Sequence, residues 1–227
     1  LRSRTYKIIA SFPAWVLLFS LAHAAGYNAD QLLKTLTQRW GASSAQKFRQ
    51  WQQMEEEAQQ MPNPLAKLKK VNEFWNKRIQ FVDDMEAWGE VDYWATPMES
   101  LGHGQGDCED FAIAKYFSLL SAGVDIAQLR LIYVKAQIGG ADSGVTQAHM
   151  VLAYYSDPNA EPLILDNLIG EILPASRRKY LTPVFSFNGQ GIWAGVAANG
   201  STGKSTSTSR LSRWQDLLNR AKAEGFE

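Results

Sequence analysis

Residues 102–112 read GHGQGDCEDFA, and this stretch holds the single cysteine of the chain, Cys108. Glycines precede the cysteine and acidic residues surround it. Beyond it, apolar side chains recur at helical spacing up to Gly123, which is typical of a residue just past a helix end. We therefore predict that a helix begins at Cys108, directly after a flexible glycine-rich loop.

A thiol in the first turn of a helix is well placed for chemistry. Unpaired backbone N–H groups and the positive end of the helix dipole both stabilise a thiolate, which is the nucleophilic form of cysteine. A lone cysteine is more often a small buried hydrophobic residue, so its position alone does not establish a catalytic role. The argument for a nucleophile therefore depends on partners elsewhere in the chain.

The composition is that of a globular protein with one core. The 227 residues are 45% hydrophobic, and 23 basic residues balance 23 acidic ones. Because nucleic-acid binding favours a basic surface, this balance gives no support for a nucleic-acid partner. A single cysteine also excludes an internal disulfide, even in an exported protein.

The beginning of the chain has the pattern of a signal peptide. A basic start precedes an apolar run at residues 8–21, and residues 22–24, AHA, fit a small-x-small cleavage site. The run is shorter than the ~20 residues of a spanning helix, although an uncleaved anchor is the alternative. We predict export and no membrane span after cleavage. The predicted regions are a signal at 1–24, a catalytic domain at 25–198, and a Ser/Thr/Gly-rich linker with a terminal amphipathic helix at 199–227.

The pattern of the domain changes from helical to extended along the chain. Three helices are predicted to begin near Asp30, Ser44 and Pro64, and an irregular aromatic stretch follows at residues 83–101. Strands are predicted at residues 129–133, 147–155 and 163–168, with a further hairpin at 183–193. Because consecutive strands with short connections favour an antiparallel sheet, the expected fold class is α+β.

Two polar residues fall on the strands that follow the cysteine helix. His149 and Asp166 belong to consecutive strands with a turn near Pro158, so they should lie almost opposite each other on one face. This is the geometry of a base held by a carboxylate. We predict that Asp166 orients His149, and that His149 keeps Cys108 ionised. Taken singly, a core histidine and a turn aspartate are the more common roles of such residues.

The reaction also needs hydrogen-bond donors that stabilise the negative charge developing on the carbonyl oxygen. The backbone N–H of Cys108 would be one of them, because it lies at the start of a helix. We predict Gln105 as the second donor, with Tyr93 and Trp94 as weaker candidates.

The acidic residues beside the cysteine admit two interpretations. Asp107, Glu109 and Asp110 lie within four residues of one another, and like charges beside a thiol oppose its ionisation. A bound cation would offset this, and all-oxygen coordination suits calcium, not zinc. However, Asp107 and Asp110 also have the spacing of a helix-capping pair. The residues alone leave the metal site and the helix cap equally open.

Separated motifs of the chain resemble one enzyme family. They are DYWATP at residues 92–97, GDCEDFAIAKY at 106–116, AHMVL at 148–152 and LDN at 165–167. These motifs are similar to those of the bacterial transglutaminase-like cysteine proteinases, and within that family to the LapG-type periplasmic proteases. The resemblance implies a papain-like or transglutaminase-like α+β fold, with N-terminal helices and the nucleophile helix packed on an antiparallel sheet. The final helix is expected to be peripheral to this core, and the sequence leaves open whether it docks on the domain or stays loose.

The resemblance also implies an activity. It implies a calcium-dependent periplasmic cysteine endopeptidase that uses Cys108, His149 and Asp166 and forms a thioester acyl-enzyme. The implied substrate is a large cell-surface adhesin, cut near its N-terminal region at a di-alanine site, which would disperse a biofilm. An inner-membrane cyclic-di-GMP receptor is the implied inhibitor, and calcium, held by Asp107, Glu109 and Asp110, is the implied cofactor.

Two other functions remain open from the sequence. The first is a protein-glutamine acyl-transferase or deamidase that uses the same triad, because the chemistry up to the acyl-enzyme is shared. The second is a catalytically inactive binding module.

Overall fold

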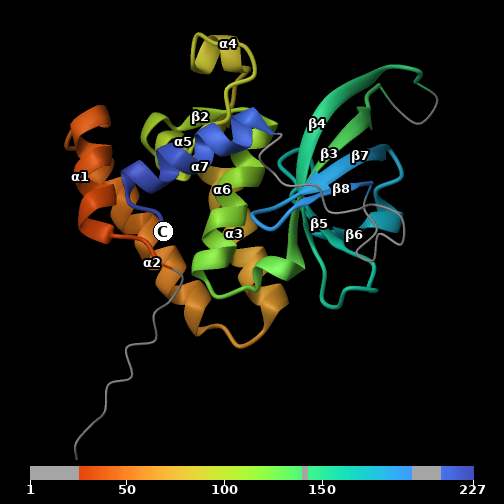
Figure 1. Cartoon of the computed structure of the whole chain (residues 1–227), viewed down its shortest axis with the longest axis horizontal. Coiled ribbons are helices and arrows are strands. Elements are labelled where there is room, and N and C mark those ends of the chain that lie inside the picture. The colour runs from red at the N-terminus through yellow and green to blue at the C-terminus, as the bar shows by residue number, and fades with distance from the viewer. Residues whose placement is uncertain (1–25, 140–142, 196–210) are drawn as a thin grey trace, which may run out of the picture.

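The computed structural model describes residues 26–139, 143–195 and 211–227, and it places a group of helices beside one sheet (Figure 1). The predicted signal peptide at residues 1–24 and most of the predicted linker lie outside the described residues. The division into three regions therefore stays a prediction. Within the part of the chain that the structure describes, no helix combines the length and apolar character needed to cross a bilayer.

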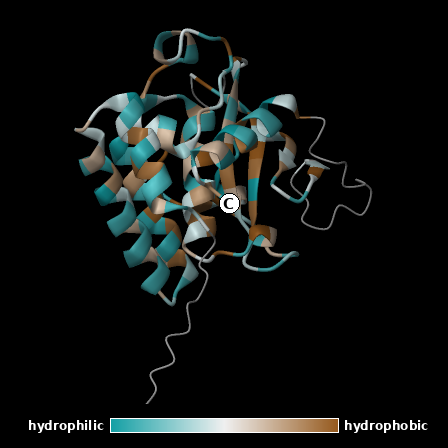
Figure 2. Cartoon of the chain, turned by 60° about the vertical axis from the view of Figure 1, so that its left-hand side comes forward, coloured by the Kyte–Doolittle hydropathy of each residue, from teal (hydrophilic) through white to brown (hydrophobic). Residues whose placement is uncertain are grey.

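The three N-terminal helices form where their apolar periodicity predicted them. They are α1 (Ala29–Trp40), α2 (Ser44–Gln60) and α3 (Pro64–Arg78). Asn28, not Asp30, caps α1 through its side chain, while Asn63 caps α3 with Pro64 in the first turn. Their apolar faces supply a large part of the core, and Figure 2 shows hydrophilic residues along the outer helices and hydrophobic ones on the strands.

The segment before the cysteine is more regular than predicted. It contains α4 (Asp84–Ala87) and α5 (Pro97–His103), and β1 (Gln80–Phe81) pairs in parallel with β2 (Gln105–Gly106). The prediction of a flexible glycine-rich loop was wrong, because two of its residues complete α5 and Gly104, with φ +81°, ends that helix in the left-handed conformation. Thr96 and Glu99 form a capping box at the start of α5.

The cysteine helix α6 (Cys108–Ser121) is buried between the other helices and the sheet (Figure 1). The terminal helix α7 (Ser212–Glu224) packs on the same core through Trp214, Leu217 and Ala221, which are all buried. Of the two arrangements left open for the final helix, docked or loose, the structure shows the docked one. Its apolar stripe serves the core of the domain.

The sheet has six strands in the order β6-β5-β4-β3-β7-β8, and all neighbouring pairs are antiparallel. The strands are β3 (Leu129–Gln137), β4 (Thr146–Tyr154), β5 (Leu163–Leu165), β6 (Leu173–Pro174), β7 (Leu181–Phe187) and β8 (Ile192–Ala194). Short 3-10 helices precede β3 at Ile126–Gln128 and β7 at Ala175–Arg177. Met150 and Leu152 of β4 join the core on the helix side, while Val151 and Ala153 join a smaller cluster on the other face. The predicted α+β class with an antiparallel sheet is confirmed.

One acidic side chain lies inside the helical layer. Glu55 of α2 is fully buried, close to Trp51 and Ser118. Burial raises the pKa of Glu55 to about 8, and nearby Ser118 and Trp51 offset this only in part. Glu55 is therefore protonated in the folded protein at neutral pH.

We predict that Glu55→Gln weakens the pH dependence of stability. Its proton is held up to about pH 8 in the folded state, but is lost near the ordinary pKa of 4.5 in the unfolded chain. The stability that this proton contributes is fully present below pH 4.5 and is lost as the pH rises through about 8. Urea midpoints of the variant should therefore fall less than those of the wild type between about pH 5 and 8. The exposed neighbour Glu56→Gln should keep the wild-type slope, and an equal slope for Glu55→Gln would contradict the assignment.

Candidate active site

Cys108 is the first residue of α6, as predicted, and Asp107 is its N-cap. The Asp107 side chain accepts a hydrogen bond from the Glu109 N–H at 3.2 Å. Cys108 Sγ accepts a hydrogen bond from the backbone N–H of Met150 and lies 2.7 Å from Glu109 Oε2. The N-terminus of α6 is therefore held against β4.

The surroundings of Cys108 favour the neutral thiol. Burial raises the pKa of the thiol well above its usual range, and the negative charges of Glu109 and Asp107 raise it further. The Met150 N–H lowers it by a smaller amount. Additional positive charge is needed before this cysteine becomes a thiolate near neutral pH.

His149 and Asp166 come together as the sequence predicted. His149 Nε2 lies 2.8 Å from Asp166 Oδ1, and both side chains are buried. Because Leu152 pairs with Leu165 at the end of β5, the two residues are diagonal neighbours and not directly opposite. Within the described part of the chain, the thiol donates to Glu109 Oε2 and not to the imidazole, and it accepts from the N–H of Met150, the next residue of β4. This arrangement suits a nucleophile and base, and their catalytic roles stay a prediction.

Asp166 has a cationic partner that the sequence analysis missed. Arg178, which is 2% exposed, forms an ion pair with Asp166 Oδ2 and donates from Nε to Tyr180 Oη at 2.7 Å. Burial alone would raise the pKa of Asp166, but His149, the Leu168 N–H and Arg178 lower it below its ordinary value. Asp166 is therefore ionised. Arg178 stands in a basic run with the pattern of a solvated surface, so no sequence signal marked it.

A further group of acids lies close to the start of α6. Asp84, Asp107 and Asp110 place carboxylate oxygens within 4.8 Å of one another, the arrangement of a metal-binding group. Asp84 Oδ2 accepts from the Tyr93 N–H at 2.6 Å, whereas its buried Oδ1 has no hydrogen-bond partner among the described residues. Asp84 was missed because it lies in the stretch that the sequence analysis interpreted as an irregular aromatic loop.

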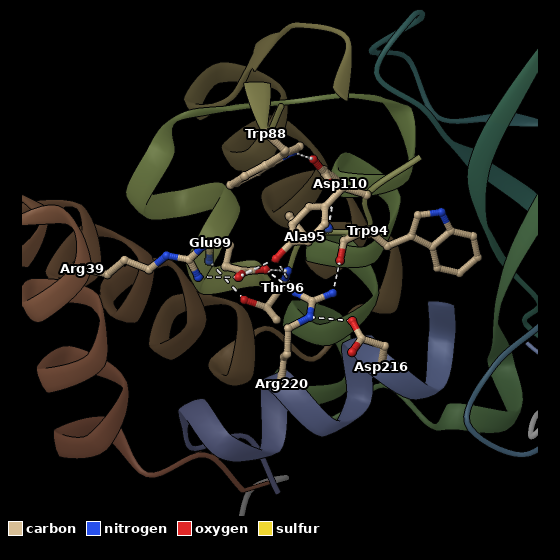
Figure 3. Close-up of polar contacts among 10 residues, drawn as sticks. Arg39, Trp88, Trp94, Ala95, Thr96, Glu99, Asp110, Asp216 and Arg220 are labelled. Atoms are coloured by element: carbon tan, nitrogen blue, oxygen red, sulfur yellow. Dashed lines mark hydrogen bonds and ion pairs between the residues drawn. The ribbon is translucent and has the colours of Figure 1, made fainter. Parts of the chain in front are cut away.

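The three acids predicted as ligands divide into two overlapping groups. Asp107 belongs to both, Asp110 lies with Asp84, and Glu109 lies with Cys108. Asp110 Oδ1 accepts from the Ala95 N–H at 2.7 Å and Oδ2 from Trp88 Nε1 at 3.2 Å (Figure 3). Asp107 therefore caps the helix as the alternative interpretation proposed, while Asp110 bonds to the preceding segment instead of completing a capping pair.

The acidic group has the properties of a cation site. Burial, and then repulsion by neighbouring acids, raises the pKa of Asp107 to about 10. Burial raises the pKa of Asp110 well above its usual range and that of Asp84 to about 6. Carboxylates held this close gain from a shared divalent cation, and ligands that are all oxygen suit calcium. The unpartnered Asp84 oxygen fits the same interpretation.

The candidate oxyanion donors differ in availability. Gln105 lies in β2, three residues before the cysteine, and is half-buried. Tyr93 donates its hydroxyl to Glu99 Oε1 at 2.8 Å, and Trp94 donates Nε1 to Asp92 Oδ1 at 3.0 Å. The two weaker candidates are therefore engaged elsewhere, and Gln105 stays the prediction.

We predict that Asp166→Asn destabilises the fold as well as the site. It leaves the Arg178 charge buried without its carboxylate, a situation that costs about 3–5 kcal/mol of unfolding free energy. The double variant Asp166→Asn/Arg178→Met should recover most of that loss, because the uncompensated charge is gone. Urea unfolding of both variants measures this. A double variant less stable than Asp166→Asn would contradict the account.

Comparisons with known proteins agree with this geometry. A sequence model of the bacterial transglutaminase-like cysteine proteinases matches residues 37–199. Legionella pneumophila LapG is 36% identical, with a TM-score of 0.70 over 86% of this chain and 97% of that chain. Its calcium-bound structure is 36% identical, with a TM-score of 0.69 over 85% and 98%. The EGTA-treated structure is 35% identical, with a TM-score of 0.72 over 86% and 97%. None of the curated protein sequences matches the chain significantly.

Proposed function

Because the chain belongs to the bacterial transglutaminase-like cysteine proteinases, we propose that Cys108, His149 and Asp166 form the triad of a calcium-dependent endopeptidase. One observation carries the assignment. His149 is bonded to the buried, ionised Asp166 at 2.8 Å, and the residue next to it in β4 bonds the Cys108 sulfur. The base and its orienting acid are thus bonded to each other, and the strand that carries the base also contacts the nucleophile.

The mechanism follows from these positions. His149 accepts the Cys108 proton, and the sulfur attacks the scissile carbonyl carbon, whose oxygen is held by the Cys108 N–H. His149 then protonates the leaving amine as the peptide C–N bond breaks, which leaves a thioester. His149 next removes a proton from water, whose oxygen attacks the thioester carbon and releases the thiol. Asp166 keeps the imidazole oriented and stabilises its charged form.

Asp84, Asp107 and Asp110 are the residues that we propose to hold calcium, with Glu109 beside them. Bound calcium would supply the positive charge that offsets these carboxylates and makes the neighbouring thiol easier to ionise. The calcium-bound and EGTA-treated structures of the similar Legionella LapG support this proposal. The Asp107 cap is compatible with it, because one carboxylate accepts an N–H and still offers an oxygen to a cation.

The proposed setting is the periplasm. The signal-peptide pattern at residues 1–24 supports export, and a large surface adhesin is the proposed substrate. Cleavage near its N-terminal region would release the adhesin and disperse a biofilm. An inner-membrane cyclic-di-GMP receptor is the proposed inhibitor.

We predict that the purified protein shortens an N-terminal adhesin fragment in calcium. Cys108→Ala, His149→Ala and the double variant should each lose activity to the same residual level, because the two residues act as a unit. Gel electrophoresis with a parallel assay of amine incorporation measures both outcomes. Incorporation of amine without chain cleavage would favour the acyl-transferase, and no activity of either kind would favour the binding module.

We also predict that Asp84→Asn weakens calcium binding by about tenfold or more, because calcium affinity follows the number of carboxylate ligands. Isothermal titration calorimetry measures this without any substrate. The neighbouring exposed residue supplies the matched control, and Asp83→Asn should bind calcium as the wild type does. Equal affinity for Asp84→Asn and wild type would remove Asp84 from the site.

A further inference from the structure

One short segment holds two of the proposed calcium ligands. The Tyr93 N–H donates to Asp84 Oδ2 at 2.6 Å, and the Ala95 N–H donates to Asp110 Oδ1 at 2.7 Å. We call residues 92–96 the ligand-holding segment. Because its backbone donors fix two carboxylates that come from different helices, its position decides whether those carboxylates can meet around one ion.

The terminal helix α7 holds this segment through Arg220. Arg220 Nη2 donates to the Trp94 carbonyl at 2.6 Å, one residue before the Ala95 N–H that reaches Asp110 (Figure 3). Arg220 Nη1 donates to Tyr93 Oη at 3.0 Å, and the guanidinium carbon lies 4.7 Å from the centre of that ring. All of these contacts come from one rigid, planar group.

A second arginine of α7 holds the start of the same segment. Arg213 Nη2 lies 2.8 Å from Asp92 Oδ2, and Arg213 Nε donates to the Asp92 carbonyl at 3.0 Å. Asp92 has φ +59°, the left-handed conformation that residues other than glycine rarely adopt. Such a conformation persists only where its surroundings hold it, and these two contacts come from α7.

The end of the segment is fixed by Glu99, which is 1% exposed. Glu99 Oε2 accepts from the Thr96 N–H at 2.9 Å and forms an ion pair with Arg220 (Figure 3). Its other oxygen pairs with Arg39 of α1 at 2.5 Å. The carboxylate is therefore shared by α1, α5 and α7. In addition, α7 bonds the carbonyl oxygens of Asp92 and Trp94 in the segment.

From these contacts we propose that Arg213 and Arg220 are positioning residues for the calcium site, so that docking of α7 and binding of calcium are coupled. The inference rests on the proposed calcium site. Neither arginine contacts a ligand carboxylate in the described structure, and both act through residues 92–96. Because such coupling is reciprocal, calcium also stabilises the docked α7. This helix lies beyond residues 37–199, the part matched by the family model.

The test is the calcium affinity of the full chain without substrate, measured by isothermal titration calorimetry. Arg213→Met/Arg220→Met should bind calcium about 10–100-fold more weakly than wild type, as expected when groups that orient metal ligands are lost. Arg220→Lys should stay weak, because a lysine amine keeps the charge but cannot reach Trp94, Tyr93 and Glu99 together. Wild-type affinity in the double methionine variant would overturn the inference while leaving the calcium site in place.

Two controls separate positioning from general destabilisation. Arg39→Met removes the other ion pair of Glu99, and Val71→Ala opens the core in α3, away from α7. Val71→Ala should keep calcium affinity within about twofold of wild type even where thermal melts show lost stability, since sites without shared partners are usually independent. Arg39→Met shares Glu99 with Arg220 but leaves the bonds of Arg213 and Arg220 to the segment in place, so it should weaken calcium binding less than the double variant does. An affinity loss in Val71→Ala equal to that of the double variant would overturn the inference. A wild type that binds no calcium would overturn the site and the inference together.

The reciprocal effect gives an independent readout. Saturating calcium should slow amide hydrogen exchange in α7 and residues 92–96 of the wild type, and should slow it less in Arg213→Met/Arg220→Met. If the wild type binds calcium but the amide exchange rates of α7 are the same with and without the ion, the coupling is contradicted.

Discussion

The crowding of carboxyl groups around one buried thiol is the constraint on which the rest of this structure depends. Asp107 and Glu109 lie beside Cys108 at the start of α6, and Asp107 also lies close to Asp84 and Asp110. Burial and the neighbouring acids raise the pKa values of Asp84, Asp107 and Asp110, so hydrogen-bond donors or a cation are needed to stabilise their charged forms. The backbone donors come from residues 92–96, and we propose calcium as the cation.

The pKa of Asp166 and the pKa of Asp107 are shifted in opposite directions by their surroundings. Asp166 forms an ion pair with Arg178 and is bonded to His149, and these contacts lower its pKa below the ordinary value. Among the described residues, no basic side chain is paired with Asp107, and the pKa of Asp107 rises to about 10. Asp166 is thus ionised at neutral pH and can orient a base. The other acids depend on an external charge, which is how a cysteine proteinase could be made responsive to a metal ion.

The sequence predicted the parts of the site that local patterns determine. The helix start at Cys108 follows from apolar periodicity, and the pairing of His149 with Asp166 follows from strand order. The Asp107 cap was one of two interpretations that the sequence left open. The α5 helix was missed although a signal was present, because Thr96, Pro97 and Glu99 have the spacing of a capping box behind a first-turn proline.

Other parts of the site depend on contacts between distant segments. Asp84, Arg178 and Arg220 act on residues up to 127 positions away in the chain, and each looks like an ordinary surface charge in its own segment. The spacing of apolar residues carries no information about such partners. It indicates which face of a helix or strand is buried, but not which other element packs against that face. The structure was needed to show which charges are paired.

The most direct test of the charge balance is the alkylation rate of Cys108 by iodoacetamide at pH 7 as calcium is titrated. Cys108 is the single cysteine, so every label reports the site. The account predicts a rate that rises with calcium and saturates, with a midpoint equal to the calorimetric dissociation constant. A rate that is unchanged or lower in saturating calcium would contradict it.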